Sequence, residues 1–243
     1  MKASRLDRYL VDQRLAASRA RAIALIREGL VSVNGVIVEK PAARVPSGAD
    51  VFIEAHEDYV SRGAKKLAAA LAVFSPPTEG KVCLDLGAST GGFCDVLLRA
   101  GAAKIYAVDV GTGQLHDRLA KDPRLINLER THANTLSTDI IADSIDLIVC
   151  DVSFVSLRKV LGYALALAAP AAHVIALIKP QFELGPEKIG KGGIVTATPD
   201  EILALQEDIK DWFRSEGWQP TAVIDSPIDG GDGNKEYLIA ASR

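Results

Sequence analysis

The chain has 243 residues, of which 48% are hydrophobic and 24% are charged, so it is long enough for one large domain or for two domains with packed cores. Its formal net charge of −3, taken as one number, argues against nucleic acid or an anionic membrane as a partner. That mean hides a split, because residues 1–66 hold 12 Lys and Arg against 8 Asp and Glu, while the remainder has a net charge of −7. A basic N-terminal segment therefore precedes an acidic body.

Cysteine and apolar content define the expected cellular environment. Cys83, Cys94 and Cys150 lie among apolar neighbours without a CxxC spacing, so neither a disulfide framework nor a metal site is expected. Residues 160–178 lack Asp, Glu, Lys and Arg but contain Pro170, which favours a buried helix to residue 169 and a buried strand from residue 173 over a membrane span. With no signal-peptide pattern at the N-terminus, we expect a cytoplasmic protein without stable membrane insertion.

The first 53 residues predict two helices and a small sheet. Asn34-Gly35 joins two short alternating runs and indicates a β-hairpin, and a last short strand is expected at residues 51–53. The first helix is expected after Ser4, with one apolar face made of Leu6, Tyr9, Leu10 and Leu15. The second is expected from Ser18 to a stop at Gly29, with an apolar face made of Ala20, Ile23, Ala24 and Ile26.

Five arginines line these two helices, and arginine forms bidentate contacts with phosphate groups. They are Arg5, Arg8, Arg19, Arg21 and Arg27. A solvated helix face has a similar composition, so charge alone leaves both interpretations open. The runs Arg-Leu-Asp at 5–7, Ser-Arg-Ala-Arg at 18–21 and Val-Ser-Val-Asn-Gly at 31–35 resemble the S4 RNA-binding domain over residues 3–53. This resemblance implies binding of structured RNA, commonly ribosomal, through the basic helical face.

The rest of the chain alternates strands and helices. We expect a first domain at residues 1–54, a polar linker at 55–60 and a second domain at 61–243. A helix at 61–74 ends before Pro76-Pro77, and a later helix is expected at 199–215. Strands are expected at 82–86, 105–110, 125–128, 145–150, 173–178, around Val223 and at 237–241. The pattern predicts an α/β fold with an open, mostly parallel, seven-stranded Rossmann-like sheet that binds ligands at the carboxyl ends of its strands.

A glycine-rich turn follows the first of these strands, and Asp109 ends the second strand, where it could accept hydrogen bonds from both ribose hydroxyls of an adenosine group. The turn departs from the G-x-G-x-x-G of dinucleotide folds, and Asp85 before it would repel a diphosphate but suits the cationic groups of S-adenosylmethionine. NAD and a ligand-free structural turn are the alternatives. The turn reads Asp85-Leu86-Gly87-Ala88-Ser89-Thr90-Gly91-Gly92-Phe93.

This turn resembles the first motif of class I, S-adenosylmethionine-dependent methyltransferases of the FtsJ/RrmJ type. The resemblance implies S-adenosylmethionine as the cofactor. Asn134, after the third strand, is expected near the adenine. The expected cofactor contacts are therefore Asp85, Gly87, Ala88, Ser89, Gly91, Gly92, Phe93, Asp109 and Asn134.

Two charged residues end apolar strands at the same edge, which is costly unless the charges are paired or used. They are Asp151 and Lys179; Lys66 before them and Glu236 after them complete an order that resembles the Lys-Asp-Lys-Glu tetrad of ribose 2'-O-methyltransferases. Methylation of a ribose hydroxyl requires a base, and a lysine serves only if its pKa falls well below about 10.4. The alternative for each residue is a surface ion pair. Lys65 competes with Lys66, which is preferred because the family lysine directly precedes the first Leu of its helix.

Other methyl transfers fit less well. Amino methylation of bases usually has an Asn/Asp-Pro-Pro-aromatic run, where this chain has Asp-Val-Ser-Phe at 151–154. Cytosine C5 methylation needs an exposed nucleophilic cysteine, whereas Cys150 is expected to be buried. The glycine-rich residues 181–198 are expected to form a mobile lid over the target nucleotide.

The S4-like segment ahead of an FtsJ-like segment resembles the TlyA family over nearly the whole chain. That family implies 2'-O-methylation of cytidine in ribosomal RNA, with ribosomal RNA or ribosomal subunits as partners. No metal is expected, because the sulfonium of the cofactor brings its own driving force. Its members are also labelled haemolysins, so a membrane-active haemolysin is one alternative, which the broken apolar segment disfavours. An RNA-binding ribosome-assembly factor with an inactive methyltransferase domain is the other, which the complete glycine motif and tetrad disfavour.

Overall fold

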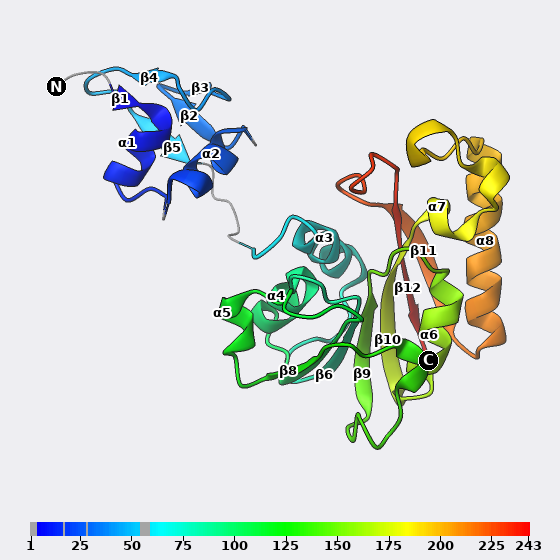
Figure 1. Cartoon of the computed structure of the whole chain (residues 1–243). Helices are drawn as coiled ribbons and strands as arrows, with labels where there is room; N and C mark the ends of the chain where they lie inside the picture. Colours follow the sequence, from blue (N-terminus) through cyan, green and yellow to red (C-terminus); the bar gives the residue numbers. More distant parts are fainter. Residues whose placement is uncertain (1–3, 17, 28, 54–58) are drawn as a thin grey trace. The chain divides into compact units, whose positions relative to one another are not determined.

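The structure is a computed structural model that describes residues 4–16, 18–27, 29–53 and 59–243. The chain divides into two compact units, Met1–Asp58 and Tyr59–Arg243 (Figure 1). The expected domain end at residue 54 and most of the expected linker lie outside the described residues. The last two linker residues, Tyr59 and Val60, pack against the core of the larger unit.

The smaller unit combines two helices with short strands. Strands β2, β3 and β5 form an antiparallel sheet in the order β3-β2-β5, and β1 pairs with β4. Apolar side chains from α1, α2 and β2 form its core. The elements are β1 Ser4–Arg5, α1 Leu6–Asp12, α2 Arg19–Arg27, β2 Val31–Val33, β3 Val36–Ile37, β4 Arg44–Val45 and β5 Val51–Ile53.

The hairpin prediction in this unit is confirmed. Asn34 and Gly35 join β2 to β3 and have φ angles of 52° and 78°. Two successive positive φ angles define the type I′ turn, whose twist matches that of the flanking strands. Asn34 also accepts a hydrogen bond from the backbone N–H of Asp50 at 2.9 Å, which ties the hairpin to the turn before β5.

The two helices differ in detail from the prediction. Helix α1 ends at Asp12, so Leu15 lies beyond it and is 42% exposed instead of packing on its apolar face. Helix α2 buries Ala22, Leu25 and Ile26. That set has the i, i+3, i+4 spacing of one helical face, so the predicted face was rotated from the true one.

The larger unit contains a seven-stranded sheet in the order β11-β12-β10-β9-β6-β7-β8. Strand β12 is antiparallel to both of its neighbours, and the other strand pairs are parallel. The predicted mostly parallel seven-stranded sheet is confirmed. The strands are β6 Val82–Leu86, β7 Lys104–Val108, β8 Leu125–Leu128, β9 Ile145–Cys150, β10 Ala168–Ile178, β11 Gln219–Asp225 and β12 Tyr237–Ser242.

Helices cover both faces of this sheet (Figure 1). Helices α3 (Ala64–Phe74), α4 (Gly92–Arg99) and α5 (Asp117–Ala120) lie on one face, and α6 (Leu157–Leu165) and α8 (Pro199–Ser215) on the other. Successive strand residues point to opposite layers, so Cys83 belongs to the core under α3 and α4, and Leu84 to the core under α6 and α8. This two-sided burial explains why the central strands are almost wholly apolar.

The apolar segment after β9 was partly mispredicted. Helix α6 ends at Leu165 rather than continuing to residue 169, and β10 begins at Ala168. The register of β10 against β9 shifts between Ala168 and His173, and Pro170 lies exposed within this irregular stretch, where it need not donate a ladder hydrogen bond. Within the described ranges, no helix has the length and apolarity needed to cross a membrane.

Candidate active site

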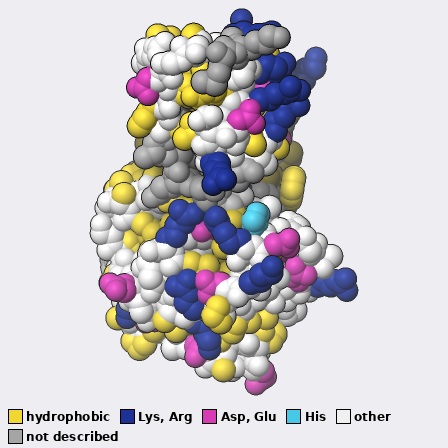
Figure 2. Space-filling view, turned by 90° about the vertical axis from the view of Figure 1, so that its left-hand side faces the viewer, with side chains coloured by type: hydrophobic (Ala, Val, Ile, Leu, Met, Phe, Trp, Pro, Cys, Tyr) yellow, Lys and Arg dark blue, Asp and Glu magenta, His cyan; other side chains and the backbone are white. Residues whose placement is uncertain are grey.

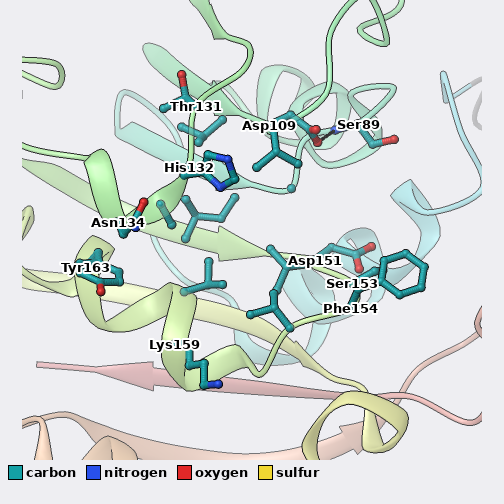
Figure 3. A pocket seen from close by; sticks show the side chains of 18 of the residues that line it. Ser89, Asp109, Thr131, His132, Asn134, Asp151, Ser153, Phe154, Lys159 and Tyr163 are labelled. Carbon is teal, nitrogen blue, oxygen red and sulfur yellow. Dashed lines mark hydrogen bonds between the residues drawn. The ribbon is translucent and has the colours of Figure 1, made fainter.

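A cavity of about 760 Å³ opens at the carboxyl ends of β6, β7 and β9 (Figure 3). The strand order reverses between β6 and β9, and ligands of open α/β sheets bind at such a switch point. Gly87 and Ser89 line the cavity from the turn after β6, Asp109 from the end of β7, and Asp151 from the end of β9. Asn134 lines it from the short 3₁₀ turn Ala133–Thr135.

The glycine-rich turn fits tightly against the end of β9. Gly87 has a φ of 82°, and a Cβ built on it would lie 2.5 Å from the carbonyl oxygen of Asp151, so a larger residue would push the two strand ends apart. Gly91 also has a positive φ, 89°, and precedes α4. A smaller cavity of about 130 Å³ adjoins the turn and includes, of the predicted cofactor residues, Gly87, Ala88, Ser89, Gly92 and Phe93.

Asp109 is held in place by backbone groups. Its Oδ2 accepts a hydrogen bond from Ser89 N at 2.8 Å, and its Oδ1 accepts one from Gly111 N at 2.7 Å. Each carboxylate oxygen retains a further acceptor site. Asn134 is exposed and lies near Tyr163 and His132, away from Asp109 (Figure 3).

Asp85, in contrast, does not reach either cavity. Its side chain is fully buried beneath the turn, where Oδ2 accepts a hydrogen bond from Cys94 Sγ at 3.0 Å. Its Oδ1 has no hydrogen-bond partner among the described residues. Burial raises the pKa of Asp85 to about 7. The structure therefore does not place this carboxylate where it could touch a cationic ligand in the cavity, contrary to the expectation.

The four residues of the predicted tetrad converge. Lys66 Nζ, from α3, lies 2.5 Å from Glu236 Oε2 and 3.9 Å from Asp151 Oδ2. Lys179 Nζ lies 2.6 Å from Asp151 Oδ1. Lys66, Lys179 and Glu236 are buried, and Asp151 is the member that lines the cavity. Lys65, the competing lysine, is half-buried and is absent from these contacts.

Two ammonium groups and two carboxylates give this cluster, the Lys66–Asp151–Lys179–Glu236 tetrad, a net charge of zero. Burial of an unpaired ion costs several kcal/mol, so the alternation of signs is what allows the tetrad to be buried. Asp151 sits between the two ammonium groups and is shared by them. Such an arrangement fixes two amines at the edge of a pocket, where they can meet a hydroxyl group.

Two neighbours of Asp151 are functional candidates that the sequence reasoning missed. Ser153 Oγ accepts a hydrogen bond from Lys179 Nζ at 2.9 Å and lines the cavity. Phe154 is 88% exposed at the cavity rim, has a φ of 66°, and its ring centroid lies 5.2 Å from that of Phe182. An exposed aromatic residue in a left-handed conformation is uncommon. In the sequence, the run Asp-Val-Ser-Phe argues against amino methylation but does not single out either residue.

Glu183 is a third functional candidate that the sequence did not reveal. It ends the short helix α7 (Pro180–Glu183), which begins directly after Lys179. Its Oε1 accepts a hydrogen bond from Leu157 N at 2.6 Å, and its Oε2 accepts one from Ser156 Oγ at 2.8 Å. Glu183 thus joins the segment after Lys179 to the start of α6, which follows the Asp151–Phe154 run.

The glycine-rich residues expected to form a lid contain two 3₁₀ turns, Pro186–Lys188 and Lys191–Gly193. Asn234, which is 3% exposed, accepts a hydrogen bond from Val195 N at 2.8 Å and donates one to Gly193 O at 2.9 Å. Since Asn234 lies two residues before Glu236, this segment is tied to the loop that carries one member of the tetrad. Its movement stays a prediction.

The five predicted RNA-binding arginines lie in the smaller unit, where Lys and Arg side chains gather along one side (Figure 2). Arg5 lies in β1 rather than in the first helix. The side chains of Arg8 and Arg27 are exposed. Arg5 and Arg19 both bind Asp7, which is fully buried.

The sheet order, the single antiparallel strand β12 and the cavity at the switch point define the class of Rossmann-like methyltransferases. A family model described as FtsJ-like methyltransferase matches residues 59–243, and a model of the S4 domain matches residues 4–51. The 16S/23S rRNA (cytidine-2'-O)-methyltransferase TlyA of Mycobacterium tuberculosis is 41% identical over 97% of this chain and 88% of its own. This chain belongs to the TlyA family, in which an S4 domain precedes an FtsJ-like methyltransferase domain.

Two further matches extend along the same length. The 23S rRNA (cytidine-2'-O)-methyltransferase TlyA of Campylobacter jejuni is 34% identical over 95% of this chain and 96% of its own. A solved structure from Streptococcus thermophilus that carries the name hemolysin is 36% identical, covers 99% of this chain and 88% of its own, and superposes with a TM-score of 0.75.

Proposed function

We propose that this chain transfers a methyl group from S-adenosylmethionine to the 2'-hydroxyl of a cytidine in ribosomal RNA. The observation that carries the proposal is the Lys66–Asp151–Lys179–Glu236 tetrad at the edge of the cavity. Two of the matched relatives are named as cytidine-2'-O-methyltransferases of ribosomal RNA, which supports the choice of reaction and substrate.

The cavity residues fit S-adenosylmethionine. The larger and the smaller cavity share Gly87, Ser89 and Asp151, which suits a ligand made of a nucleoside and an amino acid joined at one reactive centre. Asp109 would accept the ribose hydroxyls, and Asn134 would lie beside the base. When bound, S-adenosylmethionine supplies an electrophilic methyl group.

The chain's own contribution is to orient the target hydroxyl and to take its proton. Lys179, held by Asp151 on one side and by Ser153 on the other, is the amine placed to take that proton. Glu236 and Asp151 hold Lys66 beside it, where the ammonium group orients the hydroxyl oxygen. Positioning of this kind supplies much of the rate enhancement in reactions between two bound partners. Phe154 offers an exposed ring against which the base of the target nucleotide can stack.

The smaller unit would supply RNA affinity. In this proposal residues 1–54 bind ribosomal RNA or a ribosomal subunit through Arg5, Arg8, Arg19, Arg21 and Arg27, residues 55–60 connect the domains, and residues 61–243 carry out methyl transfer in the cytoplasm. The match of the S4 model to residues 4–51 supports this division of labour.

The test is to incubate the pure protein with S-adenosylmethionine labelled on its methyl group and with ribosomal subunits or free 16S and 23S ribosomal RNA from a strain that lacks the gene. Label is expected in RNA, at a cytidine whose ribose then resists alkaline cleavage on its 3' side. Cofactor binding without transfer to any RNA would contradict the proposal. Lysis of red cells by the pure protein at low concentration would instead favour a membrane-active haemolysin.

A further inference from the structure

A buried acid binds two of the predicted RNA-binding arginines. Asp7, in α1, is 0% exposed. Its carboxylate accepts hydrogen bonds from Arg5 Nε and Nη2, from Arg19 Nε and Nη2, and from the backbone N–H of Arg8, all at 3.0 Å. Arg5 and Arg19 come from different elements, β1 and α2, and are brought together by this one side chain.

The shared carboxylate fixes the two guanidinium groups close to each other. Nη2 of Arg5 and Nη2 of Arg19 each lie 3.0 Å from the same atom, Asp7 Oδ2, so the two nitrogens can be no more than 6.0 Å apart. Two cations at that separation repel each other, and the intervening negative charge offsets this repulsion. Without Asp7, the two side chains would move apart and sample many rotamers.

The arginines, but not the acid, are accessible to a ligand. Their side chains are 41% and 53% exposed, whereas that of Asp7 is 0% exposed. A guanidinium group has five N–H donors, of which Asp7 occupies two on each arginine. The hydrogen bonds from Arg5 hold the pKa of Asp7 well below its usual range, so this carboxylate stays ionised throughout the physiological range.

We propose that Asp7 is a positioning residue that holds Arg5 and Arg19 as one preformed site for an RNA phosphate group. The inference rests on the proposed RNA-binding role of the smaller unit and extends it. A preformed site avoids the entropy cost of ordering two long side chains when RNA binds. Asp7 therefore strengthens RNA binding although it carries the same sign of charge as RNA.

The negative charge of Asp7 allows a positioning role to be distinguished from a simple effect of net charge on RNA binding. Asp12 lies on the same helix as Asp7 but is exposed, which makes it a matched control. Both Asp7→Asn and Asp12→Asn remove one negative charge from α1. Charge alone predicts tighter RNA binding for both variants, since each makes the unit more basic. Positioning predicts weaker binding for Asp7→Asn and unchanged or slightly tighter binding for Asp12→Asn.

The measurement is filter binding of the full-length chain to in vitro transcribed 16S and 23S ribosomal RNA at one fixed salt concentration. The Kd of Asp7→Asn is expected to rise about tenfold, as for loss of one well-made charged hydrogen-bonding site. The Kd of Asp12→Asn is expected to stay within about twofold of the wild type or to fall. An Asp7→Asn protein that binds as tightly as Asp12→Asn, or more tightly, would overturn the inference.

A second comparison separates positioning from a general loss of structure. Asp7→Asn is introduced into a background in which Arg5 and Arg19 are both changed to Gln. If Asp7 acts through these two arginines, its substitution has little further effect there, and the interaction energy of the cycle is large. If Asp7→Asn weakens binding equally in both backgrounds, its role is to maintain the fold and the inference fails.

These outcomes differ from failure of the proposed methyl transfer. RNA binding is measured without S-adenosylmethionine, so a chain that binds RNA but transfers no methyl group would contradict the proposed reaction and leave the Asp7 test intact. If the wild-type chain binds neither 16S nor 23S ribosomal RNA, both the proposed reaction and the inference on Asp7 lose their basis. Arg5 and Arg19 would then be explained as a tie between β1, α1 and α2.

Discussion

Both units of the chain hold two cationic side chains against one carboxylate, but the cations are exposed in one unit and buried in the other. In the smaller unit the cations are exposed and Asp7 is buried. In the larger unit the side chains of Lys66 and Lys179 are 8% and 9% exposed, and that of Asp151 is 20% exposed. Exposed arginines can meet an anion from solution, whereas buried lysines can act only on a group that enters the cavity. The same ion-pair chemistry is thus suited to binding in one unit and to catalysis in the other.

A third carboxylate shows what the cations contribute. Asp85 is as fully buried as Asp7, but it faces a thiol, that of Cys94, instead of a guanidinium group. The pKa of Asp7 is lowered chiefly by the hydrogen bonds from Arg5, whereas the pKa of Asp85 is raised to about 7 by burial. Burial by itself raises the pKa of both acids, so the difference between their pKa values comes from the cationic partners of Asp7.

The largest effect is expected from breaking the buried arrangement at Lys179. Lys179→Ala removes both the amine that faces Ser153 and one partner of Asp151. We expect kcat for methyl transfer to fall by about 10³-fold, within the range of general acid–base catalysis. The Kd for S-adenosylmethionine should change little, because Lys179 lies outside the residues that line the two cavities.

The matched control for this prediction is Lys121→Ala, which removes an exposed lysine just beyond α5 and away from the cavity. This variant should transfer methyl groups at the wild-type rate. Single-turnover rates with labelled cofactor measure both variants. A Lys179→Ala protein that retains more than about a tenth of the wild-type rate would show that this lysine is not the base, since loss of a base costs 10²-fold or more.

A smaller effect is expected at Glu183, which joins the segment after Lys179 to the start of α6. Glu183→Ala should let the Asp151–Phe154 run shift against Lys179, and a displacement of about 1 Å can cost about 100-fold in rate. We expect kcat to fall by about 10- to 100-fold, the Kd for S-adenosylmethionine to stay within about twofold, and the Leu157 amide to exchange faster with deuterium. The kcat of Glu183→Gln should lie between those of the wild type and Glu183→Ala, because the amide oxygen of Gln can still accept one hydrogen bond.

Asp122→Ala controls for the loss of a carboxylate that accepts a backbone N–H. Asp122 accepts hydrogen bonds from Arg124 N at 3.0 Å and from Arg124 Nη2 at 2.7 Å in the turn before β8, the edge strand of the sheet. Its loss should lower the melting temperature by an amount similar to that of Glu183→Ala while leaving kcat unchanged. If the two variants have the same kcat, Glu183 stabilises the fold and does not position the site.

The sequence predicted the sheet well because its strands are buried on both faces. Strands β6 and β9 are apolar apart from one aspartate in each, Asp85 and Asp146, and their predicted bounds agree with the structure. The same property made the end of α6 and the start of β10 hard to predict. The apolar run 160–178 has no polar face that would distinguish a helix from a strand. Only its long-range pairing with β9 and β12 decides where the helix ends.

The candidate site was predictable where charge interrupts an apolar pattern. Asp151 and Lys179 stood out at strand ends, and the structure brings them together. Glu183 and Asp7 did not stand out, because their role depends on partners that only the folded chain supplies, Leu157 for one and Arg19 for the other. Asp85 shows the converse error, since a charged residue at a strand end can be buried beneath the site instead of lining it.

The comparison between Asp7 and Asp85 leads to a prediction on pH. The pKa of Asp85 lies near 7 in the folded protein, above the unfolded value of 3.8, so the folded state favours the protonated form. Stability is therefore lost as the pH rises from about 4 to 7, and the loss is complete above that range. Asp85→Asn cannot ionise and should melt several degrees higher than wild type at pH 8.5, since 1 kcal/mol corresponds to about 2–4 °C for a domain of this size.

The gap in melting temperature should shrink as the pH falls toward 5, because wild-type Asp85 then carries a proton and resembles the amide. Calorimetry at pH 8.5 and at pH 5, without cofactor, measures the difference in melting temperature between Asp85→Asn and the wild type. A constant gap for Asp85→Asn would mean that its carboxylate is already charged or already protonated across the whole range.

The smallest effect concerns salt and tests the division between exposed and buried cations. Arg5, Arg19 and Asp7 together carry a charge of +1, and either Arg5→Gln or Arg19→Gln reduces it to zero. The slope of log Kd for RNA against log salt should then fall by about 1, because one fewer counterion is released on binding. Lys179→Ala should leave this slope unchanged, because its amine is buried and does not replace a counterion on an RNA phosphate. Equal changes of slope for Arg19→Gln and Lys179→Ala would mean that RNA contacts the buried lysine as directly as it contacts the exposed arginine, and that the two units are not divided between binding and catalysis.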